Sequence, residues 1–305
     1  MIIKQDDNFI QMNNKYIRDS QNTNDILNSS ELTILTLIKI NQTIKGTYVF
    51  TLNWIMKTLY YADKNTRKLK EIKEILQEFI NIDMIEVYKN IVTDEENIIK
   101  DINVFDKNDL IYCKIIEEIG EIDMKNFTMI YDREIFKIIE ISKIHKIDTY
   151  NLLHFALYIY SLLDNNKGQE DYRLCFPSLL KIYEAISLSE TTIEKYIGVL
   201  KKYEIIEADY AGYKETSKGK IKNGNMFYCR YMDRDLLIAR IERERNTHGF
   251  IKQNKLSKDK RNLKISLTQK INNLTKLKEK GLANELDIKR LDMLIDERGK
   301  LDSKE

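Results

Sequence analysis

The clearest hydrophobic pattern of the chain begins at residue 149. Residues 149–164 are apolar on most faces, which is typical of a buried helix. Residues 173–176 form a short apolar run that predicts a strand. Pro177 then favours the start of a second helix over residues 178–185, because its missing N–H costs nothing in a first helical turn.

A third helix is expected directly after a tight turn. Ser189 is a natural N-cap residue, because its hydroxyl can accept a hydrogen bond from an N–H group of the first turn. Ile193, Ile197 and Leu200 recur at helical spacing and predict the buried face. The side chains left mostly outward are Glu190, Thr191, Thr192, Lys195 and Tyr196.

Two strands and a polar loop close this region. Residues 205–208 and 226–231 are short apolar runs that predict strands. The loop of residues 210–225 between them holds three glycines and four lysines, Lys214, Lys218, Lys220 and Lys222. The predicted order is helix, strand, helix, turn, helix, strand, basic loop and strand.

This order resembles the winged helix-turn-helix family of DNA-binding proteins. The run CFPSLLKIYEAISLSETTIEKYIGVLKKYEIIEADYAG carries the resemblance. Phe-Pro-Ser precedes the second helix, Ser-x-x-Thr-Ile opens the third, and Leu-x-x-x-x-Ile-Ile leads into the wing. The match covers roughly a quarter of the chain. Such modules are common in replication initiators and regulators of Gram-positive plasmids and phages.

The resemblance implies that the third helix enters the major groove, which is about 12 Å wide. The candidate base or phosphate contacts are then Ser189, Glu190, Thr191, Thr192, Lys195 and Tyr196, and the loop lysines would neutralise flanking phosphates. Glu190 departs from the family, which usually has a basic or small polar residue there. It would either accept from a cytosine amino group or repel phosphate. The alternative is a winged helix used only for protein contacts.

A weaker copy of the pattern lies upstream, over residues 29–130. Phe50 and Asp63 are separated by 13 positions, as Phe176 and Ser189 are. A longer third helix is expected at residues 64–79, and Leu110–Ile116 is expected to be the closing strand. The basic residues Lys64, Arg67 and Lys68 open that helix. They either contact DNA or belong to an ordinary solvated helix face.

Charge is distributed unevenly, although the total is only +2. Residues 91–148 carry 8 basic and 14 acidic side chains, a net charge of −6, so they are a poor DNA surface. Residues 232–305 carry 19 and 13, a net charge of +6. Apolar positions in this tail predict two amphipathic helices joined at Gly281. The two helices either mediate oligomerisation or pack on their own domain. The basic run of the tail either contacts the nucleic acid backbone or is a solvated linker.

Catalytic chemistry has little support. The ten glycines form no phosphate-binding G-x-x-x-x-G-K-[ST] loop. The three histidines form no metal-binding pair, and His154 in an apolar helix is typical of a core histidine. Three distant cysteines exclude a disulfide framework. No apolar run reaches the ~20 residues of a membrane span, and no signal peptide is indicated. We expect a cytoplasmic protein that is not an enzyme and has no catalytic residue, metal or cofactor.

These patterns predict a mainly α protein with small β-wings, an α+β chain. The expected domains are an N-terminal arm (1–28), a winged-helix module for dimerisation or a second DNA contact (29–130), a connecting helix (131–148), a DNA-reading module (149–232) and a basic helical tail with a helical hairpin (233–305).

By analogy with plasmid initiators, the chain is expected to bind repeated double-stranded DNA sites at an origin of replication. The expected partners besides DNA are a second copy of the chain, as a homodimer or higher oligomer, and host replication proteins. The alternatives are a transcriptional regulator of the same architecture and a DNA-binding partition adaptor.

Overall fold

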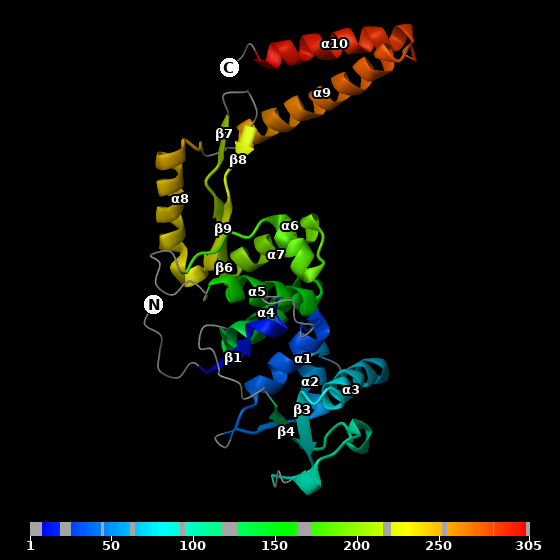
Figure 1. Ribbon diagram of the computed structural model, residues 1–305, viewed down its shortest axis with the longest axis vertical. Helices are drawn as coiled ribbons and strands as arrows, with labels where there is room; N and C mark the ends of the chain where they lie inside the picture. The colour runs from blue at the N-terminus through cyan, green and yellow to red at the C-terminus, as the bar shows by residue number, and fades with distance from the viewer. Residues whose placement is uncertain are drawn as a thin grey trace. The chain divides into compact units, whose positions relative to one another are not determined.

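The computed structural model describes residues 8–18, 26–43, 46–61, 65–91, 95–116, 127–163, 173–215, 221–251, 255–282 and 284–302 (Figure 1). These residues form a mixed α/β structure, mostly helical, with small antiparallel sheets. In this part of the chain no helix combines the length and the apolar character that a bilayer crossing requires. The chain divides into a larger compact unit, residues 1–210 with 225–243, and a smaller one, residues 211–224 with 244–305.

The N-terminal half of the larger unit contains the elements expected of the upstream copy. They are α1 (Ser29–Ile40), β2 (Tyr48–Phe50), α2 (Leu52–Tyr60), α3 (Thr66–Asn81), β3 (Ile85–Tyr88), the short 3-10 helices Glu95–Asn97 and Ile102–Val104, and β4 (Ile111–Ile115). β4 pairs antiparallel with both β2 and β3, so the sheet order is β2-β4-β3. The predicted closing strand is thereby confirmed.

A second pair of strands links the first residues of the chain to its middle. β1 (Phe9–Asn13) pairs antiparallel with β5 (Phe127–Tyr131), and the 3-10 helix Asn14–Tyr16 follows β1. In this pair Ile10 and Met12 point into the core, while Phe9 and Gln11 are exposed. The sequence left residues 1–28 as an arm without a strand, so β1 is an element that the pattern did not reveal.

The C-terminal half of the larger unit follows α4 (Asp132–Ile144), which occupies the predicted connecting segment. Its elements are α5 (Thr149–Leu163), α6 (Leu179–Ile186), α7 (Glu190–Lys202), β6 (Ile206–Tyr210), β9 (Met226–Arg230), the 3-10 helix Tyr231–Asp233 and the first part of α8 (Arg234–His248). β6 and β9 pair antiparallel, and Cys175 forms an isolated bridge to Tyr228 on β9. The predicted helices and the strands β6 and β9 are therefore present in the expected order, but the strand expected at residues 173–176 is reduced to the single bridge at Cys175.

One hydrophobic core runs through both halves of the larger unit. It joins side chains of α1, α2 and α3 to side chains of α5, α6 and α7. The apolar helix α5 is central to it, because Leu153, Phe155 and Ile159 are all fully buried. A satellite cluster packs α8 onto β9 through Leu237 and Ile241. The two predicted modules thus share a core rather than folding around separate ones.

A buried ion pair fastens the connecting helix α4 to the C-terminal half of the larger unit. Arg230 Nη1 at the end of β9 lies 3.0 Å from Glu134 Oε2 in α4, and both side chains are largely buried. Tyr160 donates to the other carboxylate oxygen at 3.1 Å. The same carboxylate accepts a backbone hydrogen bond from Tyr131 and so caps α4.

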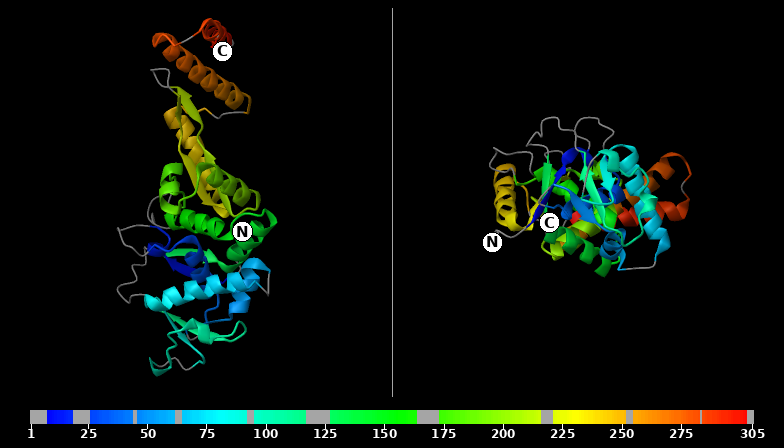
Figure 2. Two further views of the ribbon diagram at one scale, coloured as in Figure 1. Left: turned by 90° about the vertical axis from the view of Figure 1, so that its right-hand side faces the viewer. Right: turned by 90° about the horizontal axis from the view of Figure 1, so that it is seen from below.

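The smaller unit contains a strand pair and a helical hairpin. β7 (Tyr213–Glu215) pairs with β8 (Ile221–Asn223), and Ile251 bridges to Tyr213 on the other edge of β7. The helices α9 (Lys255–Glu279) and α10 (Glu285–Asp302) lie side by side (Figure 2). Gly281 has a φ of +67° in the turn that ends α9, a conformation that glycine adopts without strain. The predicted helical hairpin is confirmed.

Candidate nucleic-acid interface

The helix α6, a three-residue turn and the helix α7 form the centre of the candidate interface. Ser178, rather than Pro177, begins α6 as its N-cap, and its hydroxyl accepts a hydrogen bond from Lys181 N at 3.2 Å. Ser187 ends α6 in the left-handed region, with φ +53°. Ser189 caps α7, as predicted, and accepts from Thr192 N at 3.3 Å. The turn is therefore fixed by a cap at each helix end.

The solvent face of α7 carries most of the predicted contact residues. Ser189, Glu190, Thr191 and Lys195 are exposed, and Thr192 is half-buried. The hydroxyl of Thr192 lies 2.8 Å from Ser189 Oγ, and that of Thr191 lies 3.1 Å from it. The three hydroxyls thus form one cluster at the start of the helix. A duplex placed there would meet hydroxyl donors and acceptors as well as the ammonium group of Lys195.

Tyr196 is buried, so its predicted outward orientation is wrong. Its side chain is only 3% exposed, and its ring lies 6.2 Å from that of Phe155 in α5. Burial, with a smaller effect of the nearby Asp148 charge, raises the pKa of the tyrosine to about 12. The physical reason is helical geometry: residue 196 is three positions after Ile193 and four before Leu200, both of which are in the core.

The structure adds two residues to this face that the sequence reading overlooked. Glu194 is exposed, one turn beyond Glu190, so the face carries two carboxylates beside Lys195. Gly198 follows a further turn along, and a Cβ built there would meet nothing within 4 Å. Glu190, Glu194 and Gly198 follow one another at intervals of four residues, and this spacing alone would have placed both residues on the face of Glu190. A helix-interior glycine that faces open space lets another molecule approach the backbone closely.

The basic loop is a strand pair in the smaller unit. Lys214 on β7 stands directly opposite Lys222 on β8. Like charges placed opposite each other repel, so an anion at this position would relieve that repulsion. Lys214 also donates to the carbonyl oxygen of His248 at 3.1 Å and lies 5.0 Å from the ring centroid of Phe250. Lys222 is exposed. Lys218 and Lys220 lie outside the described residues.

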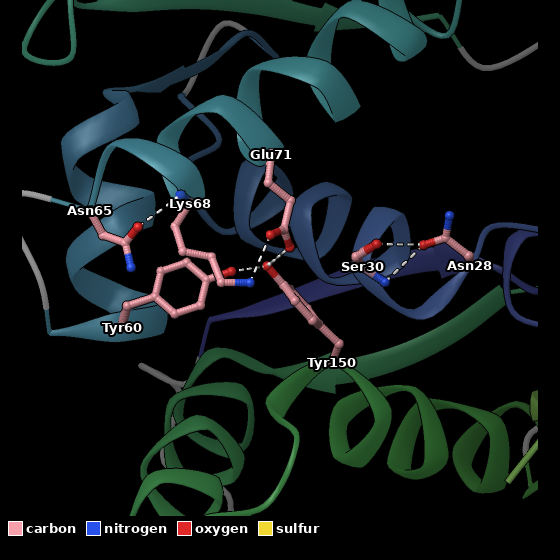
Figure 3. A network of polar contacts seen from close by, with 7 residues as sticks. All are labelled: Asn28, Ser30, Tyr60, Asn65, Lys68, Glu71 and Tyr150. Atoms are coloured by element: carbon pink, nitrogen blue, oxygen red, sulfur yellow. Dashed lines mark hydrogen bonds and ion pairs between the residues drawn. The ribbon is translucent and has the colours of Figure 1, made fainter.

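The basic start of α3 is only partly available for DNA (Figure 3). Lys68 Nζ lies 2.7 Å from Glu71 Oε2 and 5.1 Å from the ring centroid of Tyr60. Tyr150 in α5 donates to Glu71 Oε1 at 3.3 Å and is hydrogen-bonded to Tyr60. Lys68 is therefore part of a polar network between α2, α3 and α5. The bond to Glu71 is also the main cause that raises the pKa of Lys68.

The helix ends near this network are capped by asparagines. Asn65 Oδ1 accepts from the backbone N–H of Lys68 at 3.1 Å and thus caps α3, while Asn28 caps α1 through Ser30 and Glu31 (Figure 3). α3 therefore begins at Thr66, two positions after the expected start at residue 64. Arg67 is exposed in the first turn of α3, and Lys64 lies outside the described residues. Of the three basic candidates here, Arg67 is the one that the structure places at the surface without engaging it in the network of Figure 3.

His154 and the three cysteines are buried in the core of the protein. His154 is buried, and its ring nitrogens lie 2.9 Å from Ser29 Oγ and 3.3 Å from the carbonyl oxygen of Ile17, so the core reading of this histidine is confirmed. Its burial lowers its pKa. The three cysteines are buried and unbridged. Among the described residues, no group of three or more His, Cys, Asp or Glu side chains is arranged to hold a metal ion.

The fold and this surface define a mainly helical α/β protein with a capped helix-turn-helix. Comparison with known proteins adds no relative to this description: no protein-family model matches the chain, and neither the curated proteins nor the solved structures contain a match.

Proposed function

We propose that residues 149–232 form a winged-helix module that reads double-stranded DNA in a sequence-specific manner. The observation that carries the proposal is the helix-turn-helix of α6 and α7, whose second helix is capped at Ser189 and presents Thr191 and Lys195 to solvent. The pairing of β6 with β9, and the bridge from Cys175 to β9, supports it, because this is the strand arrangement expected of such a module.

In this proposal α7 lies in the major groove. Thr191 and Lys195 meet base edges or phosphates, while Ser189 caps the first turn of the helix. Glu190 and Glu194 exclude phosphate from their part of the face and are suited to accept from a cytosine amino group. Lys214 and Lys222 on the β7–β8 pair act as separate phosphate contacts, which makes affinity depend on salt.

We further propose that the protein initiates replication of a plasmid or phage by binding repeated sites at an origin. The N-terminal half supports a two-module protein, because α1, β2, α2, α3, β3 and β4 follow the same order, with β4 between β2 and β3. The role in replication rests on the resemblance noted above. Its mechanism is binding and distortion of the duplex, followed by recruitment of host proteins.

The helix assignment is tested by the double substitution Thr191→Ala with Lys195→Ala. We expect affinity for the preferred DNA fragment to fall at least about thirtyfold, since two contacts are lost and each costs roughly 1–3 kcal/mol. The measurement is fluorescence anisotropy with fragments of the replicon that encodes the protein, at several salt concentrations. Lys137→Ala, an exposed lysine on α4, is the control and should leave affinity unchanged.

Four outcomes bear on the proposal. Sequence-independent binding by the wild-type protein, or full affinity in the double variant, would contradict the assignment of α7. A preferred fragment that contains repeated sites at an origin supports initiation, and a preferred promoter fragment contradicts it.

Gly198→Ala separates stability from recognition. Alanine in a helix interior is favoured over glycine by about 1 kcal/mol, and the added methyl group meets no atom of the protein. We therefore expect a more stable protein in urea denaturation that binds DNA more weakly, because the methyl group keeps the duplex from the backbone. Gly299→Ala is a matched control: it also adds a methyl group to open space on a helix, α10, and should leave DNA affinity unchanged. Unaltered affinity in Gly198→Ala would show that DNA does not approach α7 closely here.

A further inference from the structure

The α9–α10 hairpin leaves large apolar side chains in solvent. Leu267 and Leu291 are buried where the two helices meet. Leu282, Leu286 and Met293, by contrast, are 69%, 76% and 72% exposed. Two helices alone cannot enclose a core, because each covers only one side of the other.

The exposed residues of α10 share one side of the helix. Leu286 and Met293 are seven residues apart, which is close to two full turns. Leu291, which packs against α9, is five residues from Leu286 and so points to nearly the opposite side. α10 is therefore apolar on two opposing sides, and a helix of that kind is stable when both sides are covered. On α9, Ile265 is 43% exposed, on the side away from Leu267.

The two helices of the hairpin differ in charge. α9 contains eight basic and two acidic residues, a net charge of +6, while α10 contains four basic and six acidic residues, a net charge of −2. A second hairpin turned by a twofold axis can place its acidic helix against the basic helix of the first. The two contacts are then identical and both are attractive.

We propose that the α9–α10 hairpin is a self-association surface that binds the same hairpin of a second copy of this chain, with α9 of each copy against α10 of the other. The product is a four-helix bundle in which Leu286 and Met293 become core residues. This inference goes beyond the proposed function and does not depend on it, because self-association is measured without DNA.

The apolar side of α10 is tested in the full-length protein with Leu286→Lys and Met293→Lys together. Both positions are exposed, so the hairpin of a single chain should keep its helical circular dichroism. We expect sedimentation equilibrium to give a dimer for the wild type and a dissociation constant at least a hundredfold higher for the variant. Ile82→Lys with Ile91→Lys, which changes two residues of the larger unit that are 53% and 57% exposed, is the control and should stay dimeric.

The pairing of unlike helices is tested with two charge-reversed chains. The first carries Asp292→Lys and Glu297→Lys on α10, and the second carries Lys270→Glu and Lys276→Glu on α9. All four positions are exposed. The first variant alone should dimerise much more weakly than the wild type, since its α10 then has a net charge of +2 and faces the +6 of α9. In the second variant α9 falls to +2, so its attraction to α10 is reduced. An equimolar mixture should restore association of the first variant, because a heterodimer sets its α9 (+6) against the α10 of the second chain (−2).

Three results would overturn the proposal: a monomeric wild type at 100 μM (roughly a hundredfold above a micromolar dissociation constant), a lysine variant that stays as dimeric as the wild type, or charge-reversed chains that do not associate on mixing. If the wild type is monomeric and Lys270→Glu with Lys276→Glu weakens DNA binding, the charge of α9 serves nucleic acid instead.

Discussion

Glu134→Ala is expected to destabilise the protein by about 3–5 kcal/mol, because it leaves the buried guanidinium of Arg230 without its counter-charge. Arg230 is 11% exposed and Glu134 is 15% exposed, so water replaces little of what is lost. The substitution also removes one of the two acceptors of the Tyr160 hydroxyl, the other being the carbonyl oxygen of Ile205, and it removes the cap of α4. Urea denaturation followed by circular dichroism measures the change.

Two comparisons make this result specific. Glu140→Ala changes an exposed carboxylate of the same helix and should alter stability by no more than about 0.5 kcal/mol. Replacing both partners, with Glu134→Leu and Arg230→Met, should recover much of the loss, since no charge is then left buried. A loss below about 1 kcal/mol in Glu134→Ala would show that the pair does not fasten α4 to β9.

Tyr196→Ala is expected to cost about 3–5 kcal/mol, the range for truncating a large buried aromatic side chain. Its ring packs on Phe155 and is almost fully enclosed. Tyr196→Phe, which keeps the ring, should leave DNA affinity within about twofold of the wild type. Urea denaturation measures the stability of each variant, and fluorescence anisotropy on the same preparations measures its DNA affinity.

The control for this position is Tyr183→Ala, which truncates a tyrosine of α6 that is 52% exposed and should cost much less. If Tyr196→Phe lowered DNA affinity tenfold while stability held, the hydroxyl would have to reach DNA, and the buried position of the side chain would be contradicted.

Local patterns were sufficient to predict most of the elements. The helical spacing of Ile193, Ile197 and Leu200, with Ser189 before them, fixed both the existence and the start of α7. A helix repeats its geometry every turn, so apolar positions three and four residues apart report its buried side. The same spacing places Tyr196 on the buried side of the helix. We expected it to be exposed because its side chain has a polar hydroxyl group, but the ring of a tyrosine is large and apolar and is often buried.

Pairings between distant residues could not be predicted in the same way. β1 is short and is mixed with polar residues, and its partner β5 is more than one hundred positions away. The ion pair of Arg230 and Glu134 likewise joins two charges that look like ordinary surface residues in the sequence. At the candidate interface, the side chain of Lys68 is drawn from solvent by Glu71 and Tyr60, a contact that depends on how α2 and α3 meet.

The pairing of β1 with β5 also sets an order of events during synthesis. Phe9 pairs with Tyr131, which is 122 positions later in the chain (131 minus 9). At a synthesis rate of ~5–20 residues per second, Tyr131 is added on the order of ten seconds after Phe9. During that time Ile10 and Met12 have no partner strand. The polar residues Gln11 and Asn13 interrupt the apolar residues of this segment, which makes it a poorer template for aggregation than an all-apolar strand. β1 is therefore made well before the strand that pairs with it.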